Sequence, residues 1–291
     1  MISVLITSYN EPTSVGKALQ AFLNQTYSGS YEILVSSPDD ATASVAMSFD
    51  SVKVYKDNGI GKNYALNLLF KKAKGDIVVL SDGDVFVDKD ALKNLIEHFN
   101  DKTVGVVAGR PVSLNNRNTM MGYWSHVLFD AGAHMIRKKL FNAGKFIECS
   151  GYLFAFRNNI IQQIPFDVAE DSIIPYLFYR KGYKIAYAEG ALVFVKNPLS
   201  LNEWVKQKKR TAKGHVNLKN HFSEFPYVKS FGNEIKYGTY AALSYPITLK
   251  EFLWTIPLFL ARLFVWLSLF YDIKIKKDEF IGKWERIKST K

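Results

Sequence analysis

Two carboxylates separated by a single glycine, Asp82 and Asp84, follow a short aliphatic run at 77–80. The run is typical of a buried strand, and the two carboxylates lie in the predicted loop that leaves it. In open α/β sheets, ligands bind beyond the carboxyl ends of strands. Two hard oxygen ligands there suit Mg²⁺ or Mn²⁺ bridging substrate phosphates. A polar turn at a strand end has the same pattern, so the neighbouring motifs decide between the two interpretations.

A glycine and a lysine, Gly61 and Lys62, open the predicted helix one element upstream. Backbone N–H groups, the helix dipole and an ammonium group at a helix start can together bind a diphosphate. The spacing is not that of a Walker loop. A solvated lysine in the first helical turn is the alternative.

The elements that would position these residues alternate between strands and helices. This alternation predicts an α/β fold with a mostly parallel sheet and right-handed crossovers. The expected strands are 2–6, 31–35, 52–55, 77–80, 104–108, 152–156, 184–188 and 192–195, and the expected helices are 13–24, 62–74, 118–140, 171–181 and 200–213.

The composition indicates a folded, basic protein. Apolar residues make up 48% of the 291 residues, and the net charge is +11. Such a charge favours anionic partners: nucleic acid, nucleotide phosphates or an anionic membrane. No motif that reads nucleic acid is present, so we do not expect nucleic acid as a partner. The single cysteine, Cys149, excludes an internal disulfide. No signal peptide is visible at the N-terminus, so we expect the first half to stay in the cytosol.

The character of the chain changes beyond about residue 220, which predicts a catalytic domain over 1–220 and a membrane-associating region over 221–291. Residues 252–271 form an apolar stretch long enough to span a bilayer. Basic residues flank it on both sides, however, and Arg262 lies near its middle, which disfavours a simple crossing. Glu251, Thr255 and Arg262 share one helical face, as in an interfacial helix or a shallow re-entrant hairpin. We therefore expect peripheral association with the cytoplasmic face of the cell membrane, with a buried core helix as the alternative.

Taken in order, six motifs resemble the inverting glycosyltransferases of family 2, which have the GT-A fold. They are Val-Leu-Ile-Thr-Ser-Tyr-Asn-Glu at 4–11, Gly-Lys-Asn-Tyr-Ala-Leu-Asn at 61–67, Gly-Asp-Ile-Val-Val-Leu-Ser-Asp-Gly-Asp at 75–84, Ser-Gly-Tyr-Leu-Phe-Ala-Phe-Arg at 150–157, Ala-Glu-Asp at 169–171 and Gln-Lys-Lys-Arg at 207–210. The resemblance implies a Rossmann-like, mostly parallel sheet with flanking helices, here followed by a C-terminal helical membrane-associated segment.

The resemblance also implies a site for a nucleotide-diphosphate sugar. Thr7, Tyr9 and Glu11 would line the nucleotide pocket, with Tyr9 on the base and Glu11 near the ribose. Lys62 would face the diphosphate, Asp82 the ribose or the metal, and Asp84 the metal. The second strand usually ends in Val-Asp-Asp in this family, but here it ends in Val-Ser-Ser-Pro-Asp-Asp at 35–40. Asp39 is therefore the candidate that accepts from a base imide, and Asp40 could be a helix cap.

On the acceptor side, Asp171 would be the general base that deprotonates an acceptor hydroxyl for in-line attack. Acidic residues at a helix start are also common dipole partners, which is the alternative for Asp171. Gly151, Glu170 and Gln207 would contact the acceptor. Gln207 and Arg210 resemble a Gln-x-x-Arg-Trp motif, with Arg210 approaching the diphosphate, but Thr211 stands in the tryptophan position.

These inferences predict a metal-dependent inverting transferase that moves a sugar from a nucleotide-diphosphate donor to a lipid-linked or glycan acceptor at the membrane surface. Among such donors, a UDP-sugar is favoured. A polyprenyl-phosphate sugar synthase is the second enzymatic hypothesis. A basic module that binds a membrane surface or nucleic acid without catalysis is the third.

Overall fold

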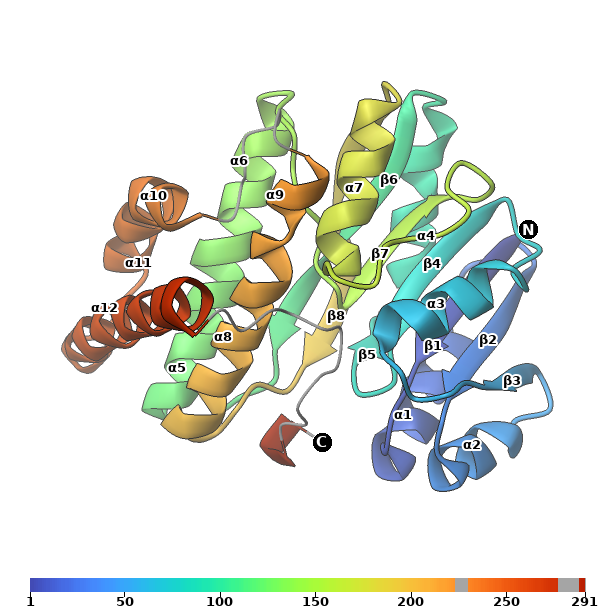
Figure 1. The fold of residues 1–291 in the computed structure, drawn as a ribbon, viewed down its shortest axis with the longest axis horizontal. Helices are drawn as coiled ribbons and strands as arrows, with labels where there is room; N and C mark the ends of the chain where they lie inside the picture. Colours follow the sequence, from blue (N-terminus) through green and yellow to red (C-terminus); the bar gives the residue numbers. More distant parts are fainter. Residues whose placement is uncertain (223–229, 277–287, 291) are drawn as a thin grey trace.

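The computed structural model describes residues 1–222, 230–276 and 288–290. Its centre is an eight-stranded sheet in the order β3-β2-β1-β4-β7-β6-β8-β5, with helices on both faces (Figure 1). The strands are β1 (Ile2–Thr7), β2 (Tyr31–Ser37), β3 (Val52–Lys56), β4 (Ile77–Asp82), β5 (Phe86–Val87), β6 (Val104–Ser113), β7 (Leu153–Arg157) and β8 (Lys184–Val195). This α/β architecture confirms the predicted fold class.

Helices connect the strands and continue to the C-terminus. They are α1 (Pro12–Leu23), α2 (Asp40–Met47), α3 (Lys62–Phe70), α4 (Ala91–Glu97), α5 (Met120–His126), α6 (Ile136–Asn142), α7 (Glu170–Arg180), α8 (Leu201–Val216), α9 (Leu218–His221), α10 (Phe231–Asn233), α11 (Thr239–Ser244) and α12 (Leu249–Phe270). Three segments are π-helical, namely η2 (Val127–Met135), η3 (Glu234–Gly238) and η4 (Tyr271–Ile275), and two are 3₁₀-helical, namely η1 (His98–Asn100) and η5 (Lys288–Thr290).

Both faces of the sheet are buried, because successive side chains of a strand point to opposite faces. Val4 and Ile6 of β1 join one apolar cluster, whereas Leu5 between them joins another on the other face. Strands β1, β2 and β4 pair in parallel, so the residues that follow them emerge at the same edge. This edge carries the motifs at 7–11 and 82–84.

The sheet is more mixed than the expected mostly parallel arrangement. β7 lies between β4 and β6 and is antiparallel to both, and β5 is antiparallel to β8. The ranges 184–188 and 192–195, expected as two strands, form the single strand β8 with an irregular register opposite Gly109. A residue pattern predicts that a segment is extended, but its direction depends on the route of the connection before it.

The C-terminal helix α12 packs against α5 and α8. A third apolar cluster joins Trp124 of α5, Trp204 of α8, and Leu258 and Val265 of α12. The Trp124 indole N–H also donates to the backbone oxygen of Trp254, at 2.8 Å. Residues 118–140, expected as a helical insertion, form α5, η2 and α6 and provide much of this packing surface.

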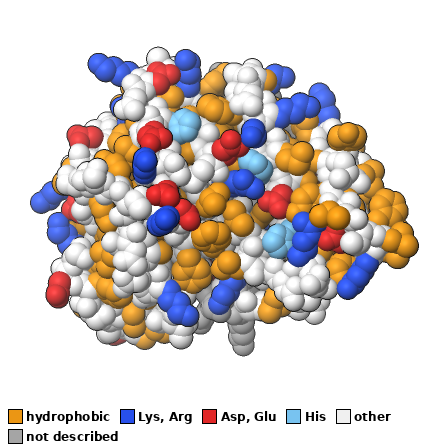
Figure 2. Space-filling view, turned by 180° about the vertical axis from the view of Figure 1, so that it is seen from behind, with side chains coloured by type: hydrophobic (Ala, Val, Ile, Leu, Met, Phe, Trp, Pro, Cys, Tyr) orange, Lys and Arg blue, Asp and Glu red, His pale blue; other side chains and the backbone are white. Residues whose placement is uncertain are grey.

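The two faces of α12 differ in polarity. Its polar residues face the protein: Glu251 binds Arg117, Thr255 contacts Tyr123, and Arg262 pairs with Glu234. Its outward face carries exposed apolar side chains: Phe252, Leu253, Ile256, Leu260, Phe264, Leu267 and Phe270. Apolar side chains gather at the edge of the molecule formed by the C-terminal helices (Figure 2). The shared face seen in the sequence thus binds Arg117 and Tyr123 at one end of α12 and Glu234 of η3 further along it.

Leu249–Ile275 is the only helical stretch in the described parts of the chain that is long and apolar enough to cross a membrane, with a mean hydropathy of 1.8. Length and composition alone are weak evidence for a crossing, since the core helix of a soluble protein can meet the same criteria. Only 22% of its most apolar window is buried, however. Most of the basic tail that follows lies outside the described residues.

Candidate active site

One large cavity of about 1330 Å³ lies at the edge of the sheet where β1 and β4 end. Its lining includes every residue that the sequence placed in the site except Asp39. These residues come from the ends of β1 and β4, from the starts of α3 and α7, from the turn before β7 and from α8. Motifs spread over two hundred residues therefore meet around one space.

The loop after β4 is pressed against the loop after β1. A Cβ atom on Gly83 would lie 2.2 Å from Ser8 Oγ and 2.9 Å from an oxygen of Glu11, so a glycine is required here for the close approach. The Ser8 hydroxyl donates to the same Glu11 carboxylate at 2.8 Å. This packing sets Asp82 and Asp84 beside the loop that follows β1.

Lys62 lies between two carboxylates. Its Nζ is 2.6 Å from Asp82 and 2.5 Å from Glu170. Burial by itself lowers the pKa of Lys62, but the two carboxylates outweigh it and raise the pKa above its ordinary value. Burial raises the pKa of Glu170, and the lysine opposes that effect. Lys62 thus links the end of β4 to the start of α7, and Glu170, expected beside the acceptor, contacts Lys62.

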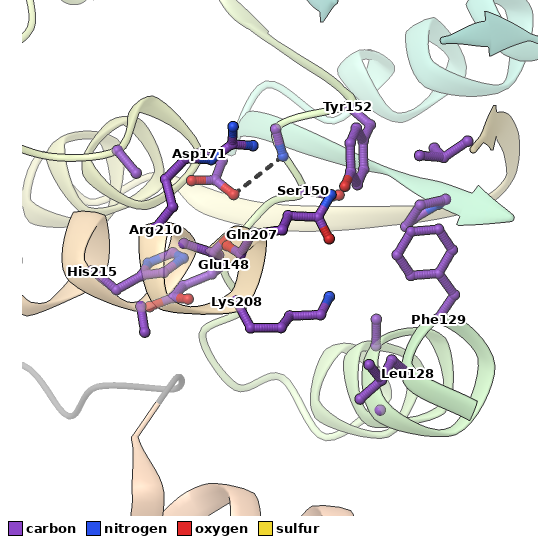
Figure 3. Close-up of a pocket in the computed structure, with 18 of the residues that line it drawn as sticks. Leu128, Phe129, Glu148, Ser150, Tyr152, Asp171, Gln207, Lys208, Arg210 and His215 are labelled. Atoms are coloured by element: carbon purple, nitrogen blue, oxygen red, sulfur yellow. Dashed lines mark hydrogen bonds between the residues drawn. The ribbon is translucent and has the colours of Figure 1, made fainter. Parts of the chain in front are cut away.

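Asp171 is held from the turn that precedes β7. The backbone N–H of Gly151 donates to its carboxylate at 3.1 Å, and the N–H of Cys149 donates to its backbone oxygen at 3.2 Å. Figure 3 shows the first of these bonds, with the Asp171 carboxylate facing the cavity near Arg210. Gly151, expected to contact the acceptor, therefore orients Asp171.

Helix α8 forms one wall of the cavity. Gln207, Lys208 and Arg210 extend from it into the space between α8 and η2, where Leu128 and Phe129 lie on the other side (Figure 3). Burial lowers the pKa of Arg210, while Tyr152, Asp82 and Asp84 attract its positive charge and oppose the shift. The Thr211 hydroxyl, in the position of the family's tryptophan, donates to the backbone oxygen of Gln207.

The loop after β1 contributes the expected nucleotide residues. Thr7, Tyr9 and Glu11 all line the cavity. Tyr9 is 60% exposed, so its ring is available to a planar ligand, whereas Glu11 is buried and accepts from Ser8. The two side chains therefore differ: one is open to solvent and the other is fixed.

Asp39 has a structural role that the sequence assigned to its neighbour. It caps α2 by accepting from the Thr42 N–H at 2.9 Å, and it also accepts from the Asn10 N–H at 2.6 Å. Burial opposes ionisation of this carboxyl, but these hydrogen bonds hold its pKa below its ordinary value. Asp40, for which a capping role was left open, pairs with Lys56 at the surface.

Two residues without a predicted role line the same cavity. Asp57, directly after β3, is buried and accepts from Ser36 Oγ at 2.6 Å and from the Gly59 N–H at 2.8 Å. Tyr152 is packed edge-on against Phe129, and burial raises its pKa. A carboxylate directly after a strand was the available signal for Asp57, the same signal that identified Asp82.

The acidic side chains of the site fit a divalent cation whose ligands come partly from the protein and partly from a substrate. No group of three or more His, Cys, Asp or Glu side chains within residues 1–222, 230–276 and 288–290 could hold a metal alone. Asp82 and Asp84 supply two carboxylates at one cavity wall. Mg²⁺ is usually bound by one or two carboxylates together with substrate phosphates and water, so this pair meets that requirement.

Solved structures share this architecture. A mannosyltransferase from Pyrobaculum calidifontis, solved with GDP-Man and Mn²⁺, covers 94% of this chain and 80% of its own with a TM-score of 0.62 at 17% identity. TarS residues 1–349 from S. aureus, solved with UDP-GlcNAc, covers 88% of this chain and 78% of its own with a TM-score of 0.54 at 16% identity. The fold is thus the GT-A fold of sugar transferases.

The sequence comparison defines the family. Residues 1–214 match the family described as "Glycosyltransferase like family 2". The chain therefore belongs to glycosyltransferase family 2 and is a glycosyltransferase, which confirms the resemblance.

Two curated relatives are each 27% identical to this chain. They are a poly-beta-1,6-N-acetyl-D-glucosamine synthase of Staphylococcus aureus (strain COL) and the probable glycosyltransferase YdaM of Bacillus subtilis (strain 168), and the matches cover 76% and 74% of this chain. The chain spans 57% and 55% of these relatives' lengths.

Proposed function

We propose that this glycosyltransferase is metal-dependent and inverting, and that it transfers a sugar from a UDP-sugar to a hydroxyl of a lipid-linked or glycan acceptor at a membrane surface. The observation that carries the proposal is that Asp171 and the pair Asp82 and Asp84 line one cavity. A base for the acceptor and ligands for a diphosphate-bound cation are thus available to the same substrate pair.

Asp171 is the proposed general base. It would take the proton of the acceptor hydroxyl as that oxygen attacks the anomeric carbon and the bond from that carbon to the diphosphate breaks. The Gly151 N–H donates to one oxygen of the Asp171 carboxylate and Ser172 Oγ lies 3.5 Å from the other, so the side chain is held in a defined orientation. A single in-line displacement inverts the anomeric configuration.

Arg210 is the proposed partner of the departing diphosphate. It is largely buried near Asp82 and Asp84, where a positive charge acts more strongly on developing negative charge than it would in water. Lys62, expected to face the diphosphate, would keep Asp82 and Glu170 in place through its ion pairs and add its charge to this wall.

Charge balance supports a divalent cation. Asp82, Asp84, Glu170 and Asp171 line this part of the cavity together with the cations Lys62 and Arg210. A nucleoside diphosphate adds further negative charge, which like-charge repulsion from the carboxylates disfavours. Mg²⁺ or Mn²⁺ held by Asp82 and Asp84 would neutralise the diphosphate.

The comparisons support a nucleotide-sugar donor, and a UDP-sugar in particular. One relative is named for a polymer of N-acetylglucosamine, and one structural neighbour holds UDP-GlcNAc. Another neighbour holds GDP-Man, so the base needs a direct test. The exposed apolar face of α12 supports action at a membrane surface.

The proposal is tested by a donor screen. The purified protein would be incubated with Mn²⁺ and UDP-, GDP- or dTDP-sugars, and release of each nucleoside diphosphate would be measured with and without an acceptor. We expect UDP release that depends on the cation and a product of inverted anomeric configuration by NMR. Release from no donor, or a product of retained configuration, would contradict the proposal.

Asp171→Asn tests the proposed general base in the same assay. The asparagine keeps the size of the side chain but cannot accept the proton, so we expect transfer to fall by about 10²–10⁴-fold. Binding of UDP, measured calorimetrically with Mn²⁺, should stay within about threefold, because Asp171 is proposed to act on the acceptor side. Full transfer activity of this variant would exclude Asp171 as the base.

A further inference from the structure

The cavity extends well beyond the residues proposed for catalysis. From Asp171 and α8 it continues between η2 and the C-terminal helices. We call this part the annex and define it by Leu128 and Gly132 of η2, Gly238 of η3, and Leu258, Leu263 and Trp266 of α12. Its walls are thus built from the helical insertion before β7 and from the C-terminal helices.

Glycines leave room in the annex. A Cβ atom on Gly132 would lie no closer than 3.7 Å to another atom, and one on Gly238 would likewise lie 3.7 Å from its nearest neighbour. A Cβ atom on Gly232, which also lines the cavity, would meet nothing within 4 Å among the described residues. A Cβ atom would thus meet no clash at these positions, and the glycines leave that space empty.

The charged groups of the annex wall are paired with each other. Arg262 Nε and Nη2 each donate to a carboxylate oxygen of Glu234 at 2.5 Å. The Trp266 indole N–H donates to the same carboxylate at 2.8 Å. The remaining wall is mainly apolar. A polyhydroxylated glycan would lose hydrogen bonds to water in such a space, whereas a hydrocarbon chain would gain from leaving water.

A polar group marks the junction between the annex and the catalytic residues. Gln207 is 6% exposed, and its Oε1 atom accepts no hydrogen bond from the described residues. Its carboxamide is directed into the cavity (Figure 3). A buried acceptor atom of this kind needs a donor, and a sugar hydroxyl can supply it.

We infer that the annex binds the hydrocarbon chain of a lipid-linked acceptor, with the head group at Gln207 and the reacting hydroxyl at Asp171. This inference rests on the proposed glycosyl transfer, and of the two proposed acceptor classes it favours the lipid-linked acceptor over the glycan. The outward face of α12 is apolar while its inward face lines the annex. A membrane lipid beside α12 would therefore lie close to the annex.

Chain length provides the kinetic test. Methyl and octyl forms of one glycoside, both below the critical micelle concentration, would be compared as acceptors with the donor found in the screen. We expect a KM at least tenfold lower for the octyl acceptor, because burial of each methylene contributes to binding. Equal KM values would overturn the inference while leaving the glycosyl transfer intact.

Filling the annex provides the variant test. In Gly132→Leu, the KM for the methyl acceptor should exceed the KM for the octyl acceptor by no more than about threefold. Because this is a ratio, any activity loss shared by the two acceptors cancels. Ser244→Leu on the exposed side of α11, outside the cavity lining, is the matched control and should keep the wild-type ratio. An unchanged ratio in a folded Gly132→Leu protein would contradict the inference.

Photolabelling tests the annex without catalysis or substitution. An octyl glycoside with a terminal diazirine would be cross-linked to the wild-type protein and the adducts located by mass spectrometry. We expect adducts on annex residues such as Leu128, Leu263 and Trp266. Adducts confined to the outward residues Leu260 and Phe264 would overturn the inference, whatever the outcome of the donor screen.

Discussion

At the scale of residues, the carboxylates of the site are distinguished by their partners. Asp82 and Glu170 share the ammonium of Lys62, whereas Asp171 accepts from the Gly151 N–H. An ammonium favours the ionised form of a carboxylate and fixes its position, whereas a backbone N–H orients a carboxylate without bringing a charge beside it. The same chemical group can therefore serve as a structural or metal-binding group on one side of the cavity and as a base on the other.

Asp84 tests the metal proposal. Asp84→Asn replaces a charged ligand by a neutral one, so we expect the stabilisation by UDP with Mn²⁺ to be largely lost. At UDP one hundred times above Kd, the wild type should gain about 2.7 kcal/mol. Thermal unfolding with Mn²⁺, with UDP and with both would measure the effect. A variant that keeps the full shift, or a wild type that needs no cation, would contradict the assignment.

Asp57 and Asp39 are two carboxylates that could recognise the nucleotide base, and matched substitutions can distinguish them. Asp57 lines the cavity, whereas Asp39 caps α2. We therefore expect Asp57→Asn to weaken UDP binding by about 10-fold or more, the effect of losing a charge-assisted hydrogen bond of about 1.5–3 kcal/mol. Asp39→Asn should mainly lower the melting temperature, since loss of a cap costs about 0.5–2 kcal/mol. Calorimetric titration with UDP would separate the two, and the reverse ranking would restore Asp39 as the base-binding residue.

At the scale of elements, α8 connects the site to the C-terminal helices. Ser172 and His215 are hydrogen-bonded to each other, and the Ala169 N–H donates to the backbone oxygen of Gly214. On the other side, Lys209 lies 2.7 Å from Asp272. The helix that carries Gln207 and Arg210 is therefore fixed both to the start of α7 and to η4, the segment that follows α12.

The first turn of α12 is anchored by a pH-dependent contact. Glu251 binds Arg117 at 2.7 Å and accepts from the Ile247 N–H at 2.7 Å. The Arg117 guanidinium, with the backbone N–H groups of Ile247 and Thr248, lowers the pKa of Glu251 to about 2, although burial opposes this shift. A carboxyl whose pKa is lower in the folded state stabilises the fold above its unfolded pKa, and this stabilisation is lost as the pH falls toward 2.

Glu251→Gln should therefore destabilise the protein in a pH-dependent way. At pH 7 we expect the melting temperature to fall by about 2–4 °C for each kcal/mol lost. The difference from the wild type should shrink as the pH falls from about 4.5 toward 2, because the wild-type carboxyl then becomes protonated. Thermal unfolding by circular dichroism at pH 7 and pH 3 would measure it, with Glu97→Gln in α4 as the control. A pH-independent difference would contradict the ion-pair explanation.

At the scale of the whole molecule, the chain combines a basic catalytic half with an apolar outward face on α12. The net charge of +11 favours an anionic membrane, and the exposed side chains of α12 supply apolar surface. Removing α12 altogether would uncover Trp124 and Trp204, so deletion would confuse loss of the anchor with loss of the fold. Surface substitutions avoid this problem.

Leu260→Glu with Phe264→Glu tests membrane association. Both side chains are more than half exposed, so the folded protein should tolerate the charges. Burial of each residue in lipid would contribute about 1.5–3 kcal/mol, and we expect their loss to move most of the protein from the membrane pellet to the supernatant. Met47→Glu on α2, an exposed apolar residue far from α12 in sequence, is the control. An unchanged pellet fraction with a folded protein would refute the anchor.

Local patterns were sufficient for the parts of the site that depend on neighbours in the chain. The aliphatic run at 77–80 predicted a strand, and β4 extends two residues further than expected, so that it ends at Asp82 and only Asp84 lies in the loop. The helix start at Lys62 and the helix that carries Glu170 and Asp171 were also found within one residue. Burial of consecutive residues and the chemistry of helix starts are encoded within a few positions, so a single sequence reveals them.

Other parts depend on residues far apart in the sequence, and the sequence did not reveal them. The capping role of Asp39, the pairing of Lys62 with Glu170, and the position of Asp57 in the cavity each require segments to meet in space. For the same reason, the sequence showed that Glu251, Thr255 and Arg262 share a face of one helix but not what that face contacts.

The sequence by itself thus determined the family, the GT-A fold, and the order in which candidate donor and acceptor residues occur along the chain. Only the tertiary structure decided which carboxylate pairs with which cation, that the polar face of α12 binds Arg117 and Glu234, and that an apolar annex opens beside Gln207. The reason is physical: periodicity and capping act over a few residues, whereas an ion pair or a cavity exists only where packing brings distant segments together.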